Sequence, residues 1–84
     1  MLSIKQNKVC IVGLGYVGVP LALSFARKNF KVTGFDINLK KIDDLKNGID
    51  STNEAKKYGI HHLKKIFFTS KYKEISDSNI YIIT

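Results

Sequence analysis

Three glycines near the amino terminus have the spacing of a turn that binds a diphosphate. Gly13, Gly15 and Gly18 form the pattern G-x-G-x-x-G directly after the apolar run Val9–Val12. In such a turn Gly13 lets the chain leave a strand sharply, Gly15 leaves room for the diphosphate, and Gly18 lets the next helix pack close to the strand. The sequence therefore predicts main-chain N–H groups that face an anionic ligand.

The predicted donors are the N–H groups of Gly15, Tyr16 and Val17, at the positive end of the helix that follows. Asp36 lies 18 residues after Gly18, close to the spacing of about 20 at which an acidic residue takes the ribose hydroxyls of a dinucleotide. A 2′-phosphate would meet the negative charge of this carboxylate at close range. We therefore expect NAD in preference to NADP.

These groups must be positioned by alternating strands and helices, and the residue pattern predicts them. Apolar runs separated by amphipathic segments indicate the order β-α-β-α-β-(α)-β, an α/β fold with a Rossmann-type parallel sheet. Right-handed crossovers then place the first two helices on one face and give the strand order 3-2-1-4. The strands are expected at 9–12, 31–35, 66–69 and 79–84. The first helix is expected to begin in the glycine turn, with Pro20 in its first turn, and to continue through 21–28. The other intervening segments are expected at 39–47, at 54–65 with an interruption at Tyr58-Gly59, and at 71–76.

The buried faces of these elements are also predicted. The first helix is expected to pack through Val17, Leu21 and Phe25, which lie at helical spacing. The strand at 79–84 is continuously apolar, as buried parallel strands are. Only the segment 71–76 is available for the second face of the sheet, so we expect an incomplete domain that associates with itself through an uncovered face or edge.

The second helix contains a further candidate for the ligand site. Asn38 is expected to cap this helix, and Gly48 to follow its end. Lys41 lies one turn into the helix, five residues after Asp36. The ammonium group of this lysine either lies near the adenosine end of a bound cofactor or is a solvated helix side chain, and the spacing leaves both interpretations open.

Other reactive residue types do not form a recognisable site. Cys10 lies within the first strand and is interpreted as a small core residue; as the single cysteine it excludes an internal disulfide and points to a reducing compartment. His61 and His62 are adjacent and would point in different directions from a helix. No third ligand stands at metal spacing, so an exposed pair is expected and no metal site.

The composition limits the class of protein. The chain has 84 residues, enough for one small domain, and its 14 basic and 7 acidic residues give a formal net charge of +7. The lysines are scattered without interleaved aromatic residues, which favours a solvated surface over a nucleic-acid partner. There is no apolar run of about 18 residues and no signal peptide, so neither a membrane span nor export is expected, and we predict a cytoplasmic location.

The motifs together resemble a known family. The runs at 13–22, 32–38 and 41–50 are similar to the opening of the UDP-glucose/GDP-mannose dehydrogenase family, above all to its UDP-N-acetylhexosamine 6-dehydrogenases, which make uronic-acid sugars for capsule and O-antigen. Residues 79–84 resemble the strand before the family's Val-Pro-Thr-Pro loop. The resemblance implies pyrophosphate on the main chain of Gly15, Tyr16 and Val17. It also implies adenosine ribose at Asp36, with Lys41 beside it.

The resemblance also implies an activity. The family oxidises the C6 alcohol of a UDP-sugar to a carboxylate in two hydride transfers, through a cysteine-bound thiohemiacetal that becomes a thioester. That cysteine lies far downstream in the family, and Cys10 is no substitute for it. Residues 1–84 are thus expected to be the N-terminal portion of an NAD-binding Rossmann domain, without the sugar-binding and catalytic domains, and to be inactive alone. Glu54 receives no role, and the particular UDP-sugar is not determined.

Two further functions stay open at this point. A 3-hydroxyacid-type dehydrogenase has the same glycine pattern followed by proline, but commonly carries Met where Tyr16 and Val17 stand here. A non-catalytic NAD-sensing module would need only the cofactor site.

Overall fold

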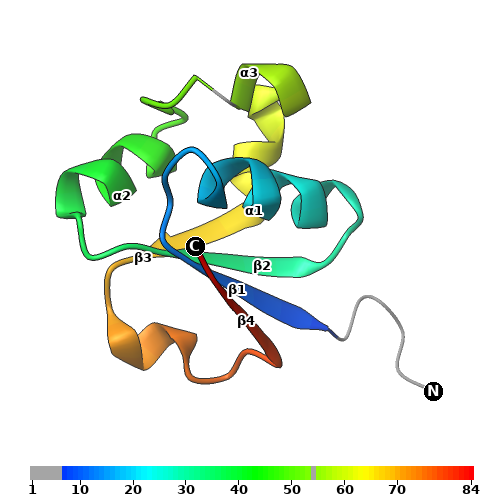
Figure 1. The fold of residues 1–84 in the computed structure, drawn as a ribbon, viewed down its shortest axis with the longest axis vertical. Coiled ribbons are helices and arrows are strands. Elements are labelled where there is room, and N and C mark those ends of the chain that lie inside the picture. The colour runs from blue at the N-terminus through cyan, green and yellow to red at the C-terminus, as the bar shows by residue number, and fades with distance from the viewer. Residues whose placement is uncertain (1–6, 54) are drawn as a thin grey trace.

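The computed structural model describes residues 7–53 and 55–84, which form one parallel sheet with helices (Figure 1). The spatial order of the strands is β3-β2-β1-β4, which confirms the predicted order. In register, Val9 of β1 lies between Val32 of β2 and Ile80 of β4. The strands are β1 (Lys8–Val12), β2 (Lys31–Phe35), β3 (Ile66–Thr69) and β4 (Ile80–Ile83).

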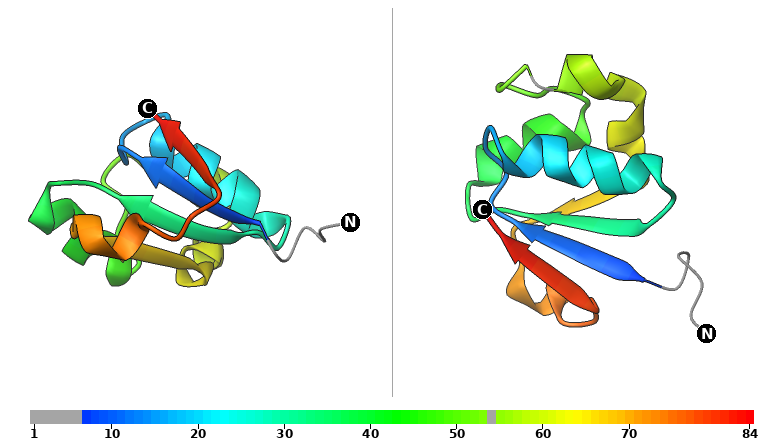
Figure 2. Two further views of the ribbon diagram at one scale, coloured as in Figure 1. Left: turned by 90° about the horizontal axis from the view of Figure 1, so that it is seen from below. Right: turned by 45° about the vertical axis from the view of Figure 1, so that its right-hand side comes forward.

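The helices are distributed unequally over the two faces of the sheet. Figure 2 shows α1, α2, α3 and η2 on one face and η3 alone on the other. The predicted interruption of the segment 54–65 is confirmed, because Gly59 separates a helical turn from a 3₁₀ helix. The bounds are α1 (Gly18–Arg27), α2 (Leu39–Lys46), α3 (Ala55–Tyr58), η2 (Ile60–Lys65) and η3 (Tyr72–Ile75).

The buried face of α1 differs from the predicted one. Val17 precedes the helix and is 67% exposed, and Leu21 and Phe25 are only half-buried at the margin of the core. Ala22 and Ala26 have small side chains, which let α1 approach the sheet closely. Leu21 and Phe25, each one residue before an alanine, therefore lie at the margin of the core. The buried residues of α1 are Gly18, Val19, Ala22, Leu23 and Ala26.

Helix ends follow the predicted signals. The side chain of Asn38 accepts a hydrogen bond from the N–H of Lys41 at 3.1 Å and caps α2. Gly48 follows the C-cap Asn47 with a φ of 78°, a left-handed conformation that suits glycine. These two residues fix where α2 begins and where it ends.

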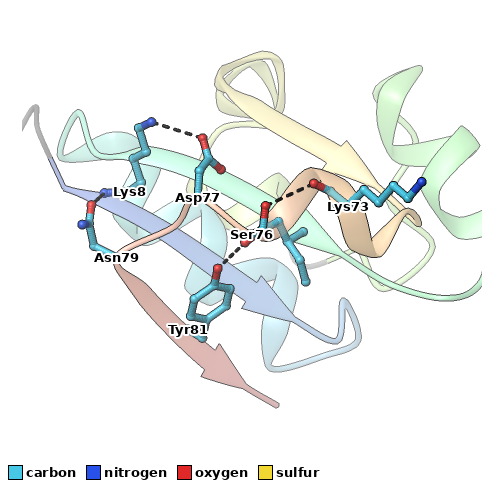
Figure 3. A network of polar contacts seen from close by, with 7 residues as sticks. Lys8, Lys73, Ser76, Asp77, Asn79 and Tyr81 are labelled. Carbon is cyan, nitrogen blue, oxygen red and sulfur yellow. Dashed lines mark hydrogen bonds and ion pairs between the residues drawn. The ribbon is translucent and has the colours of Figure 1, made fainter.

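The fourth strand is exposed, contrary to the prediction of a buried strand. Tyr81 is 45% exposed and Ile83 is 80% exposed, while Ile82 packs against the core. The reason is topological: β4 is at the edge of the sheet, and of the described elements only η3 lies on the face opposite α1. Figure 3 shows the contact between them, in which the Tyr81 hydroxyl donates to the carbonyl of Ile75.

Candidate functional site

The glycine turn lies at the carboxyl end of β1, where parallel sheets of this kind place their ligands (Figure 1). Gly13 has a φ of 99°, and its N–H donates to the carbonyl of Phe35 at 2.8 Å, which joins the turn to the end of β2. A Cβ atom at Gly13 would lie 2.8 Å from the carbonyl oxygen of Thr84. The sharp turn therefore requires glycine both for its dihedral angle and for space.

Gly18 makes the close approach that the spacing predicts. A Cβ atom on this residue would lie 1.8 Å from the carbonyl oxygen of Gly13, a main-chain atom with no freedom to move aside. The first turn of α1 thus packs directly on the turn it follows. Gly18 is a requirement of the protein's own packing.

Gly15 is the opposite case, because its surroundings are open. No heavy atom lies within 4 Å of the position that a Cβ atom would take. Tyr16 and Val17, which follow it, are 72% and 67% exposed. Among the described residues, the N–H groups of all three have no hydrogen-bond partner. The structure therefore shows free main-chain donors beside unfilled space, as a bound anion requires.

Asp36 lies at the carboxyl end of β2, next to the turn. Its Oδ2 atom accepts a hydrogen bond from the N–H of Leu14 at 3.0 Å, and its Oδ1 atom accepts one from the N–H of Asn38 at 2.9 Å. The carboxylate is thereby held beside the glycine turn. Because an ionised carboxylate has about four acceptor positions, two stay open for the hydroxyls of a ligand.

The bond to Leu14 is a role for Asp36 that the spacing did not predict. Leu14 is completely buried and has its main-chain N–H paired only with this carboxylate among the described residues. Asp36 thus stabilises the turn and also faces the site. The sequence contains no signal for this bond, because it joins residues that are 22 positions apart.

Thr84 is a second residue that sequence reasoning missed. Its N–H donates to the carbonyl of Val12 at 2.9 Å, and its hydroxyl donates to the carbonyl of Gly13 at 2.7 Å. The end of β4 therefore holds the turn from the side opposite Asp36. The one indication of this role in the sequence is that a residue with a hydroxyl group directly follows an apolar strand.

Lys41 is the third residue of α2 and is half-buried. Its main-chain N–H is used by the cap at Asn38, and no ion pair to its ammonium group exists among the described residues. The residue thus lies on the first turn of the helix that follows Asp36, and its contact with a cofactor stays a prediction.

Cys10 has the predicted structural role. Its side chain is completely buried in β1, and this burial raises the pKa of the thiol above its ordinary value. A thiol held in its protonated form is a poor nucleophile. The structure thus agrees with Cys10 as a core residue.

The two histidines do not point in different directions, contrary to the prediction. Their rings are in contact, with centroids 4.1 Å apart, although neighbouring residues of a 3₁₀ helix leave its axis about 120° apart, so the two side chains turn toward each other. Burial, followed by the positive charges of His61, Lys65 and Arg27, lowers the pKa of His62. The described residues contain no group of three side chains that could hold a metal ion, and Glu54 lies outside them.

No helix within 7–53 and 55–84 is long and apolar enough to cross a membrane.

Residues 7–84 match the model described as the UDP-glucose/GDP-mannose dehydrogenase family, NAD binding domain. The chain belongs to this family. Its glycine turn is thus the turn of an NAD-binding domain, and NAD is the cofactor of this part of the fold. This membership decides against the 3-hydroxyacid-type alternative.

Individual family members agree with this assignment. A UDP-N-acetyl-D-glucosamine 6-dehydrogenase from Salmonella typhi is 44% identical over 84 residues, which is all of this chain and 20% of the relative. The solved UDP-N-acetyl-mannosamine dehydrogenase Cap5O from Staphylococcus aureus superimposes with a TM-score of 0.80 at 33% identity, over 93% of this chain and 19% of that one. The chain therefore spans about a fifth of the length of these dehydrogenases.

A member with a different sugar has the same fold. GDP-mannose dehydrogenase from Pseudomonas aeruginosa, solved as a ternary complex, superimposes with a TM-score of 0.79 at 26% identity, over 90% of this chain and 19% of that one. The likeness across these enzymes lies in the portion that holds the sheet and the glycine turn.

Proposed function

We propose that these 84 residues are the N-terminal part of the NAD-binding domain of a UDP-N-acetylhexosamine 6-dehydrogenase. The complete protein oxidises the C6 alcohol of its sugar to a carboxylate, as a step in making a precursor for a surface polysaccharide. The observation that carries the proposal is the set of free N–H groups at residues 15–17 beside the fixed carboxylate of Asp36. The names of the similar proteins support the class of sugar.

In this proposal the cofactor lies across the carboxyl ends of β1 and β2. Its pyrophosphate accepts hydrogen bonds from the N–H groups of Gly15, Tyr16 and Val17. The adenosine ribose donates to the two open acceptor positions of Asp36, and Lys41 lies at the adenosine end. NAD accepts the hydride, and the residues of this chain bind and orient the NAD molecule.

The chain contributes no catalytic residue in this proposal. Its single cysteine is buried in β1, away from the glycine turn, so the nucleophile and the contacts to the UDP-sugar belong to other parts of the protein. A free buried thiol also agrees with a cytoplasmic location. The scattered lysines favour neither a nucleic acid nor a membrane as partner.

The test is an assay of the complete protein with NAD and each of three substrates, the UDP derivatives of N-acetylglucosamine, N-acetylmannosamine and N-acetylgalactosamine. We expect NADH to form with one of them, two NADH per sugar, and at a much lower rate when NADP replaces NAD. The 84-residue chain alone should form none. Binding of NAD without oxidation of any nucleotide sugar would favour an NAD-sensing module instead.

We also propose that the isolated chain associates with itself through β4. This strand presents exposed apolar side chains at Tyr81 and Ile83, and no strand lies beyond it among the described residues. Sedimentation of the 84-residue chain should show dimers or larger species, and Ile83→Lys should shift them toward the monomer. The surface variant Lys56→Gln is the control. A chain that is monomeric at all concentrations would contradict this proposal.

A further inference from the structure

A hollow of about 350 Å³ lies at the amino ends of β1, β2 and β3. The glycine turn lies at the other end of the strands. We call it the amino-end hollow. Side chains alternate along a strand, and Val9 and Val32 point to the core under α1, so Lys8 and Thr33 point to the other face. The residues used below are Lys8, Lys31, Thr33, Lys65, Phe67 and Asp77, all of which line the hollow.

Three of these residues form a row of positive charge. Lys8 pairs with Lys31 in the register of β1 and β2, and the pairing of Val32 with Ile66 places Lys65 level with Lys31. Neighbouring strands are about 4.8 Å apart, and like charges in directly opposite positions repel. Negative charge nearby would reduce the repulsion between these three lysines.

The protein supplies only part of this charge. Asp77 pairs with Lys8 at 3.2 Å, as Figure 3 shows. Glu74, the other carboxylate of the hollow, accepts the hydroxyl of Thr69. Within the described ranges, Lys31 and Lys65 have no ion-pair partner. The three lysines that line the hollow thus outnumber its two carboxylates, Asp77 and Glu74, by one.

The rest of the lining has a different chemistry. The ring of Phe67 is in the middle of β3 and is 50% exposed, and Thr33 is half-buried beside it on β2. An exposed aromatic ring beside two cations fits a molecule that has both an anionic group and an apolar part. The volume of the hollow is within the range of small-molecule sites, about 300–1,000 Å³.

We propose that the amino-end hollow binds a small organic phosphate, with its phosphate between Lys31 and Lys65 and its apolar part on Phe67. Two lysines without an ion-pair partner among the described residues can each donate to a phosphate monoester, which offers more acceptor oxygens than a carboxylate. The site is separate from the glycine turn, so it does not depend on the proposed function.

The test is lysine footprinting on the complete protein, with phenyl phosphate as the probe. Acetylation of Lys31 and Lys65, measured by mass spectrometry, should fall several-fold with increasing probe. Lys28 at the C-cap of α1 and Lys56 in α3 are exposed lysines that do not line the hollow. Their acetylation should not change with the probe. The decrease should saturate and yield a dissociation constant.

A pair of double variants separates a local site from general charge. Lys31→Gln with Lys65→Gln should weaken phenyl phosphate binding on the order of tenfold or more, because charge-assisted contacts are lost. Lys28→Gln with Lys56→Gln removes the same two charges and should leave binding within about twofold. Inorganic phosphate should bind more weakly than phenyl phosphate if Phe67 contacts the ring.

Several results would overturn the proposal. Equal protection of all four lysines would show only screening by the anion. Low reactivity of Lys31 and Lys65 before any probe is added would show that polypeptide covers the hollow. Protection confined to Lys41 would place the anion at the glycine turn, which would contradict this inference and leave the proposed function standing.

Discussion

Replacing Gly15 with alanine is expected to remove NAD binding and leave the fold intact. The added methyl group meets no protein atom within 4 Å, and the backbone is not in the left-handed region, so the free energy of unfolding should not fall. The methyl group instead occupies the space in which the pyrophosphate approaches the main chain. We expect NAD affinity to fall on the order of 100-fold, which is about 2.7 kcal/mol.

Gly18→Ala is the matched control for this prediction, because it adds the same methyl group three residues away. There the methyl group collides with the carbonyl of Gly13 at 1.8 Å, so we expect a loss of stability of about 1–3 kcal/mol or more, as for other overpacked sites. Thermal unfolding and NAD titration of both variants give the comparison. A Gly15→Ala protein that binds NAD normally would show that the pyrophosphate lies elsewhere.

Replacing Asp36 with alanine should reduce both affinity and stability. The ribose loses its acceptor, which we expect to weaken NAD binding on the order of tenfold or more, since hydrogen bonds to charged groups contribute about 1.5–3 kcal/mol. The N–H of the buried Leu14 also loses its partner, at a cost of about 1–3 kcal/mol to the free energy of unfolding. Chemical denaturation and NAD titration of the same variant measure the two effects.

Asp50→Ala provides the control for Asp36. The carboxylate of Asp50 also accepts main-chain hydrogen bonds, from Thr52 at 3.0 Å and from the buried Ala55 at 2.8 Å, but it lies on the segment between α2 and α3. Its removal should lower stability to a similar extent and leave NAD affinity unchanged at temperatures where the protein is folded. If both variants lost NAD affinity equally, the effect of Asp36 would be one of folding only.

The fold could be predicted because its signals are local. The strands β2 and β3 have the predicted bounds, since polar residues stand next to or near their ends, Asn29 and Asp36 for β2 and Lys65 and Ser70 for β3. The caps at Asn38 and Gly48 depend on side chains within a few residues. The strand order follows from the handedness of the crossovers, which is nearly invariant, and needs no detail of packing.

The parts that could not be predicted depend on contacts between distant residues. The face that α1 buries is set by how closely its alanines approach the sheet, and a helical pattern alone does not distinguish it from the face of Leu21 and Phe25. The exposure of β4 depends on which elements cover its face and edge. An apolar run in the sequence does not indicate these elements. The bonds from Asp36 and Thr84 to the turn span 22 and 71 residues.

The bond between Asp36 and Leu14 has a consequence for any attempt to redesign the coenzyme preference. A redesign that admits the extra phosphate of NADP has to remove the negative charge of Asp36, and this step would also loosen the glycine turn, because the N–H of Leu14 would lose its partner. A successful redesign must therefore supply a new neutral acceptor for the Leu14 amide before, or together with, the loss of charge. Selection for a new coenzyme would otherwise meet a barrier of instability before any benefit in binding.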